Sequence, residues 1–258
     1  MRTRMFQQLV LTIIAGIFVL MIGTAISWAG PPFVTDDPEP VEYRHWEFYI
    51  ASQYVHDDAG VSATAPHIEL NYGAFQDTQL HIIVPFVYSS PKEDSRKYGL
   101  GDIEVGVKYR FIHEGDIMPQ IGLFPIVVSS TGSKSRGLGE GHVRLFIPLW
   151  LQKSWGPWTT YGGGGYWINN GNDNKNYWQT GWEIQRKISE KLTVGAEIFN
   201  TSPTAKDESD RTGFNIGTII NISEDYHLLF SAGRDMHGPS NLTVYLGFQW
   251  TFGPAEKK

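Results

Sequence analysis

Hydrophobic and polar positions alternate strictly over the last strand-like stretch of the chain, residues 241–252. Apolar or aromatic side chains from Leu242 to Phe252 occupy every second position, and polar residues, a tyrosine and a glycine fill the positions between them. This period of two gives a β-strand one oily face and one hydrophilic face. The same period recurs from His45 onwards, in segments near the length of about 10 residues that a tilted strand needs to cross a bilayer.

About twelve such segments follow one another, joined by connections that are alternately short and long, as in outer-membrane barrels. The segments are residues 45–55, 65–74, 79–88, 100–111, 117–128, 142–152, 158–168, 177–188, 192–199, 212–222, 226–234 and 241–252. The pattern predicts an all-β fold, an antiparallel up-and-down transmembrane β-barrel. An even number of strands would place both termini in the periplasm.

The direction of the two faces is the prediction on which the others depend. In residues 100–111, Ile103, Val105 and Val107 alternate with charged side chains. In a membrane barrel the apolar set faces lipid and the charged set faces the lumen. The alternative is a soluble periplasmic barrel that turns its oily face inward and binds an apolar ligand there.

Two of the segments carry a weaker pattern. Pro119 and Pro125 interrupt residues 117–128, and Gly162 to Gly165 blunt the alternation in residues 158–168. Proline cannot donate to a sheet ladder, and glycine in a strand often marks a bend or the close approach of another backbone. We therefore expect an interrupted ladder at the prolines and a bend or close contact at the glycines.

The N-terminus carries the pattern of an export signal. Arg2 and Arg4 precede an apolar run, and small residues precede a cleavage point after Ala29. An uncleaved anchor helix over residues 9–28 is the alternative. The predicted organisation is a cleaved signal peptide at 1–29, an acidic and proline-rich periplasmic lead-in segment at 30–44, an outer-membrane barrel at 45–252 and a tail at 253–258.

Composition narrows the classes of function. The chain has no cysteine, which excludes disulfides, thiol catalysis and thiolate metal sites. Its formal net charge of −6 argues against nucleic acid as a partner, and a charged fraction of 19% suits a surface that largely faces lipid. The expected location is the outer membrane, in contact with the lipid bilayer.

The predicted polar faces carry the candidate lumen-lining residues. These are Glu47, His67, Glu69, His81, Asp102, Glu104, Lys108, Arg110, Arg144, Glu183 and Glu197. In residues 100–111 the acids come first and the bases last, which would grade the lumen from acidic outside to basic inside. The alternative is a set of ion pairs that only satisfies charges in a confined space.

Enzymatic and metal chemistry find little support. His67, Glu69 and His81 would lie together on neighbouring strands, but ordinary lumenal polarity explains them better than a metal site. We predict no catalytic residue, no metal, no cofactor and no enzyme activity.

Three motifs connect the chain with a known family. They are the lead-in at residues 30–40, the start His45-Trp46-Glu47, and the run from Gly99 to Phe111. The chain resembles an outer-membrane transporter family linked to the meta-pathway of phenol degradation. The resemblance implies a Gram-negative outer-membrane barrel that passes small compounds, aromatic ones included. It brings no catalytic or ligand residues with it.

The predicted function is passive passage of small solutes through a narrow polar lumen. The alternative is a non-conducting barrel that serves as a structural or adhesin-like surface protein, with its lumen closed by ion pairs and by residues 30–43. The outer-membrane assembly machinery is an expected partner. However, Phe252 is followed by residues 253–258, whereas many outer-membrane barrels end on an aromatic residue. The sequence leaves the oligomeric state and the solute open.

Overall fold

The computed structural model describes residues 31–92, 95–171 and 173–254. The predicted signal peptide and residues 255–258 of the predicted tail lie outside this range. Within it, no helix is long and apolar enough to span a bilayer.

The described chain forms strands and one short 3-10 helix, η1 at Lys134–Arg136. The strands are β1 (Trp46–His56), β2 (Gly60–Phe75), β3 (Thr78–Pro91), β4 (Lys97–Leu100), β5 (Glu104–Ile112), β6 (Gln120–Leu123), β7 (Ile126–Val128), β8 (Arg144–Trp155), β9 (Trp158–Ile168), β10 (Tyr177–Ser189), β11 (Leu192–Thr201), β12 (Arg211–Asn221), β13 (Tyr226–His237) and β14 (Leu242–Phe252).

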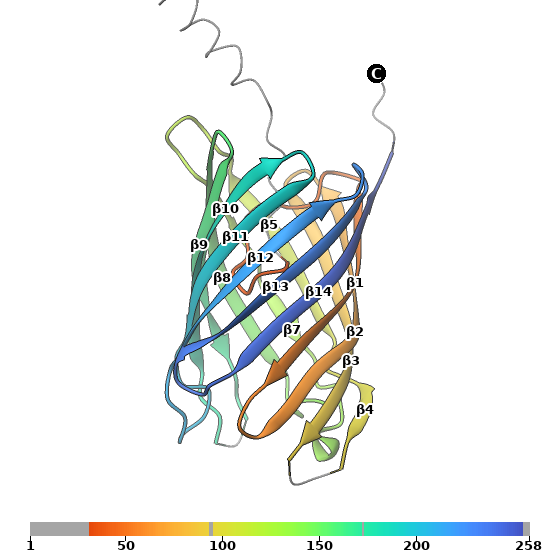
Figure 1. The fold of residues 1–258 in the computed structure, drawn as a ribbon, viewed down its shortest axis with the longest axis vertical. Helices are drawn as coiled ribbons and strands as arrows, with labels where there is room; N and C mark the ends of the chain where they lie inside the picture. The colour runs from red at the N-terminus through yellow and green to blue at the C-terminus, as the bar shows by residue number, and fades with distance from the viewer. Residues whose placement is uncertain (1–30, 93–94, 172, 255–258) are drawn as a thin grey trace, which may run out of the picture.

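These strands make a closed 12-strand antiparallel barrel, which confirms the predicted fold. β4 and β5 share one barrel position against β3, and β6 and β7 share another between β5 and β8. β1 closes the barrel by pairing with β14 from Trp46↔Phe252 to His56↔Leu242. The described parts of both termini lie at the same end of the barrel (Figure 1).

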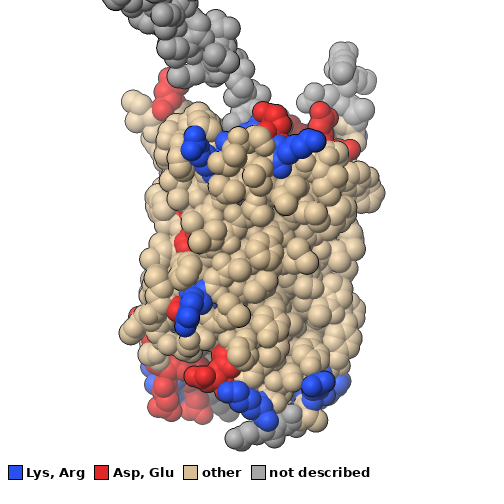
Figure 2. Space-filling view, viewed as in Figure 1, with Lys and Arg blue, Asp and Glu red and all other residues tan. Residues whose placement is uncertain are grey.

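The two faces point as the alternation predicts. Val107 and Tyr109 are 40% and 48% exposed, whereas Lys108 between them is 5% exposed. The outer surface is correspondingly poor in charge: Lys, Arg, Asp and Glu gather at the two ends, and the band between them is mostly uncharged (Figure 2). An apolar band flanked by polar ends suits a lipid bilayer.

The lumen is less uniformly polar than the sequence suggests. Tyr49, Ala51, Ile219, Leu229 and Tyr245 form one buried apolar cluster. A second cluster contains Phe124, Ile126, Val128, Phe146 and Trp150. A barrel of this size encloses little space, so inward side chains meet and partly fill it.

The two weak segments behave as expected. The ladder breaks at Phe124 and Pro125, between β6 and β7. β9 runs continuously through its glycines, and a Cβ at Gly163 would collide with the backbone carbonyl of Leu149 on β8. The glycines therefore permit close backbone approach.

Two predicted loops are partly strand. Residues 56–64 and 89–99 were expected to be loops, but β2 begins at Gly60, β3 continues to Pro91 and β4 covers Lys97–Leu100. Backbone pairing from Gly60↔Pro91 to Thr64↔Val87 extends the hairpin of β2 and β3. Backbone pairing does not require alternating apolar side chains, so the sequence pattern does not reveal these parts of the strands.

Candidate functional site

Residues 31–43, called the plug segment from here on, form a loop directly before β1, and residues 31–41 of it lie inside the barrel (Figure 1). Thr35 and Asp37 are 1% and 0% exposed, so barrel side chains surround them. The sequence predicted this stretch as a periplasmic lead-in segment, and in the alternative of a non-conducting barrel as part of what closes the lumen. In the structure it is a folded part of the lumen.

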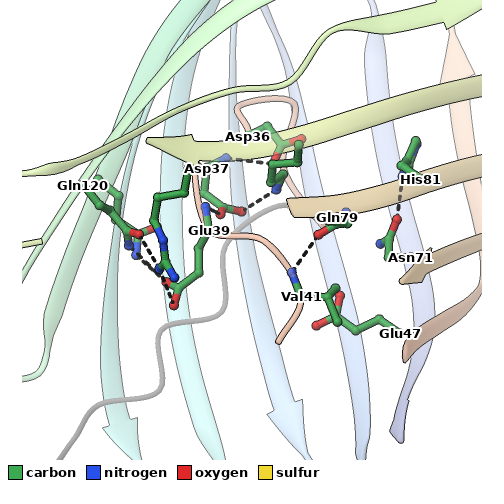
Figure 3. Close-up of polar contacts among 12 residues, drawn as sticks. Asp36, Asp37, Glu39, Val41, Glu47, Asn71, Gln79, His81 and Gln120 are labelled. Atoms are coloured by element: carbon green, nitrogen blue, oxygen red, sulfur yellow. Dashed lines mark hydrogen bonds and ion pairs between the residues drawn. The ribbon is translucent and has the colours of Figure 1, made fainter. Parts of the chain in front are cut away.

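Lys108 on β5 holds the acidic turn of the plug segment. Its Nζ donates to Asp36 Oδ1 at 2.9 Å and to Asp37 Oδ2 at 3.4 Å (Figure 3). The Lys108 side chain is 6% exposed and that of Asp37 is 0% exposed. An ion pair removed from water in this way is costly to break, because each partner would leave a buried charge uncompensated.

Glu39 is the second acidic anchor of the plug segment. Its carboxylate accepts hydrogen bonds from Gln120 Nε2 on β6 and Gln152 Nε2 on β8, both at 3.1 Å. Arg110 Nη1 on β5 lies 3.6 Å from Glu39 Oε1. Arg110 also binds Asp77 at the turn between β2 and β3, with Nη2 2.8 Å from Oδ1. Arg110 thus ties the plug segment to one end of the barrel.

Glu197 on β11 binds the backbone of the plug segment. Its carboxylate accepts from the Val34 and Thr35 amides at 2.8 Å each and from Thr35 Oγ1 at 2.7 Å. Asn215 on β12 adds a further donor at 2.6 Å. Hydrogen bonds to a charged acceptor are stronger than neutral ones, so this carboxylate is a firm attachment.

Two further contacts fix the ends of the plug segment. Ser231 on β13 donates to the Pro32 carbonyl at 2.6 Å, and the Val41 amide donates to Gln79 Oε1 on β3 at 2.9 Å. The attachments therefore come from β3, β5, β6, β8, β11 and β13, all around the barrel.

Inward-facing glycines make the space that the plug segment occupies. A Cβ at Gly181 on β10 would collide with Thr35 Oγ1, and one at Gly217 on β12 would lie 2.8 Å from the Phe33 ring. Glycine exposes the strand backbone at these points and lets another chain approach it closely. The inner wall is thus shaped to the plug segment as well as bonded to it.

A cavity of about 540 Å³ lies between the plug segment and the wall formed by β14, β1, β2, β3 and β5. We call it the acidic cavity. Two cross-strand rows line it. One row is Gln249, Tyr49, Glu69, Ile83 and Glu104, and the other is Thr251, Glu47, Asn71 and His81.

The predicted residues on this wall form one polar network. His81 Nδ1 lies 2.6 Å from Asn71 Oδ1, and His81 Nε2 lies 3.1 Å from Glu104 Oε1. Asn71 Nδ2 donates to Glu69 Oε1 at 2.8 Å. Glu47 accepts from Tyr49 OH at 2.7 Å.

The other predicted residues lie apart from this network. His67 binds Thr64 Oγ1 at 2.9 Å, and the Arg144 guanidinium lies over the Trp167 ring. Asp102 accepts from the Gly132 and Glu140 amides and so holds the loop before β8.

Glu183 on β10 is fully buried opposite Glu197. Neither of its carboxylate oxygens has a hydrogen-bond partner among the residues that the structure describes. This differs from Glu197, whose oxygens are occupied by the plug segment and Asn215.

The bases of β5 are engaged in ion pairs. Lys108 pairs with the plug segment, and Arg110 pairs with both Glu39 and Asp77. This arrangement favours the ion-pair interpretation over a graded lumen, with partners that come mostly from the plug segment. In the described part of the chain, no group of three or more His, Asp or Glu side chains is arranged to hold a metal.

Sequence reasoning missed the neutral residues that hold the plug segment, above all Gln79, Gln120, Gln152, Asn215 and Ser231. All are buried and lie on strands. Their signal in the sequence is an uncharged polar residue at an inward-facing position of a strand.

A closed antiparallel barrel with an apolar outer band and a polar, plugged lumen defines the chain as a β-barrel of the outer-membrane type. The family described as "Putative MetA-pathway of phenol degradation" matches residues 39–252, and the chain belongs to that family. No curated protein matches the sequence.

Solved structures with the same fold are outer-membrane proteins. The COG4313 outer membrane channel from Pseudomonas putida F1 has a TM-score of 0.70 at 16% identity, over 87% of this chain and 100% of that one. The NanC porin has a TM-score of 0.59 at 8% identity, over 79% and 98%. The KdgM porin, solved with disordered oligogalacturonate, has a TM-score of 0.57 at 10% identity, over 80% and 99%. At these identities the likeness concerns the fold.

Proposed function

We propose that the protein is a passive outer-membrane channel for small solutes, closed by the plug segment and opened when that segment withdraws. The observation that carries the proposal is the way the segment is held. Ion pairs and hydrogen bonds attach it to the lumen wall, and water can replace each of them when the segment leaves.

The fold and the family support this role. Of the solved structures with a similar fold, two are porins and a third is an outer membrane channel. Transport through a barrel of this kind involves electrostatics and fit, with no chemical step. The absence of enzyme activity and of a cofactor stays a prediction.

The proposed orientation places the short turns and both termini in the periplasm. In that orientation the plug segment enters the lumen from the periplasmic side, directly before β1. We further propose that the outer-membrane assembly machinery inserts the barrel, with residues 250–252 of β14 as the internal recognition stretch.

Single-channel recording in planar bilayers tests the proposal. The wild type should show a low or intermittent current, and a variant that lacks residues 31–43 should conduct more and stay open. Equal conductance in the two would contradict a closing role for the segment.

A structural barrel without conduction is the second candidate, because the plug segment fills so much of the lumen. The same recording separates the two. Silence of both the wild type and the deletion variant, with both correctly inserted, would favour the structural role.

A further inference from the structure

The acidic cavity has the size of a ligand site. Its volume of about 540 Å³ falls within the range of about 300–1,000 Å³ that small-molecule pockets occupy. It lies beside the plug segment, so a solute in it would touch both the wall and the closing element.

The charges around this cavity are strongly unbalanced. Its lining contains seven Asp and Glu side chains against one Lys and two His. Lys108 is committed to Asp36 and Asp37. Among the described residues, no Lys or Arg pairs with Glu47, Glu69 or Glu104, and the last two share His81. These three carboxylates therefore favour a positively charged occupant.

Apolar surface lies next to the carboxylates. Tyr49 sits between Gln249 and Glu69 in the cross-strand row, and Phe124 and Leu229 complete the same lining. Burial of a ring or alkyl body against such side chains is favourable because it removes apolar surface from water. An inorganic ion would leave this part of the cavity unused.

A buried donor in the cavity indicates a second polar group on the occupant. Gln249 is 2% exposed and lines the cavity, yet its Nε2 has no hydrogen-bond partner within the described chain. Thr251, two residues further along β14, also lines the cavity, and its buried Oγ1 atom has no hydrogen-bond partner among the described residues. Because a buried amide normally finds a partner, an acceptor oxygen on a ligand fits here.

We propose that the acidic cavity binds a small organic cation, a protonated amine on an aromatic or apolar body that carries an oxygen acceptor at its other end. The ammonium group is attracted by Glu47, Glu69 and Glu104, the ring packs on Tyr49 and Phe124, and the oxygen accepts from Gln249. This inference rests on the proposed channel function, because it names the class of solute.

The test uses the full-length protein in detergent and calorimetric titration with matched probes. Tyramine has the amine, the ring and the hydroxyl group, and 4-hydroxyphenylacetate replaces the amine with a carboxylate. Tyramine should bind at least tenfold more tightly. Equal binding of the two probes would overturn the proposal, because the carboxylates should repel the acid.

Variants and a third probe locate the binding. Glu47→Gln combined with Glu69→Gln should weaken tyramine binding at least tenfold, whereas Glu190→Gln at the exposed β10–β11 turn should leave it unchanged. Phenethylamine lacks the hydroxyl group and should bind the wild type several-fold more weakly than tyramine. This comparison needs no variant, so it holds even if the double variant fails to fold. Unchanged affinity in either comparison would contradict the assigned contacts.

Current recording keeps this inference separate from the proposed function. If the protein conducts but does not distinguish tyramine from 4-hydroxyphenylacetate, the proposed class of solute is wrong and the proposed channel function still stands. Specific tyramine binding without any current would support the binding site and contradict the proposed channel function.

Discussion

Among the single residues that hold the plug segment, Lys108 makes the most deeply buried ion pair. It is the basic partner of both Asp36 and Asp37, in surroundings with little water. Arg110 contributes less, because it divides its donors between Glu39, Gln120 and Asp77. Loss of one member of a buried pair is strongly destabilising, by about 3–5 kcal/mol.

Lys108→Gln should therefore release the plug segment and raise the open fraction of single channels at least tenfold. Lys187→Gln is the matched control, because Lys187 pairs with the exposed Glu190, and such surface pairs are worth about 0–1 kcal/mol. An open fraction that changes equally in both variants would show that the buried pair does not hold the segment.

Glu197→Gln should loosen the other side of the plug segment. The Gln side chain keeps one acceptor oxygen but places an NH2 group where the other oxygen was, so the Val34 or the Thr35 amide loses its hydrogen bond to a charged acceptor, at roughly 1.5–3 kcal/mol. Hydrogen exchange of a peptide that covers residues 31–43, followed by mass spectrometry, should accelerate at least tenfold. Exchange at the wild-type rate would assign the attachment to other residues.

At the scale of elements, the inner glycines of β10, β11 and β12 fit the wall to the plug segment. Gly181 gives the cleanest case, because the atoms nearest to an added Cβ all belong to Thr35 of the plug segment. The strand itself would tolerate alanine, which has more side chain to pack than glycine.

Gly181→Ala should thus increase conductance in the complete chain and change nothing in the variant that lacks residues 31–43. The comparison is made by single-channel recording on the four proteins. An equal effect of the substitution in both backgrounds would mean that it disturbs the barrel wall and acts independently of the plug segment.

At the scale of the whole molecule, the barrel and the plug segment are separable. The barrel closes through backbone ladders between neighbouring strands, whereas the plug segment attaches mainly through side chains and adds one isolated bridge, Tyr43↔Gly73. Removing the segment leaves every named strand pairing in place.

The variant without residues 31–43 should therefore still fold and insert. On a denaturing gel, the unheated sample should migrate differently from the heated one, as for the wild type. Loss of this heat-dependent shift would show that the plug segment is required for the barrel itself.

The barrel and the direction of its two faces could be predicted from the amino-acid sequence alone. Alternation is a local property, and the strict sequence order of strands in an up-and-down barrel means that neighbours in the chain are neighbours in space. Residues 100–111 suffice to predict which face of the strands meets lipid. The prolines of residues 117–128 predict the break in the ladder between β6 and β7.

The sequence suggested residues 30–43 as a filler of the lumen only in the alternative of a closed barrel, and the folded chain was needed to show that they lie there and what holds them. The lead-in has no period, and its partners lie far along the chain, with Thr35 bonded to Glu197 and Pro32 to Ser231. Such contacts depend on which inward side chains face one another across the closed barrel. Alternation says that Lys108 points inward, but only the folded chain shows that Asp36 and Asp37 meet it there.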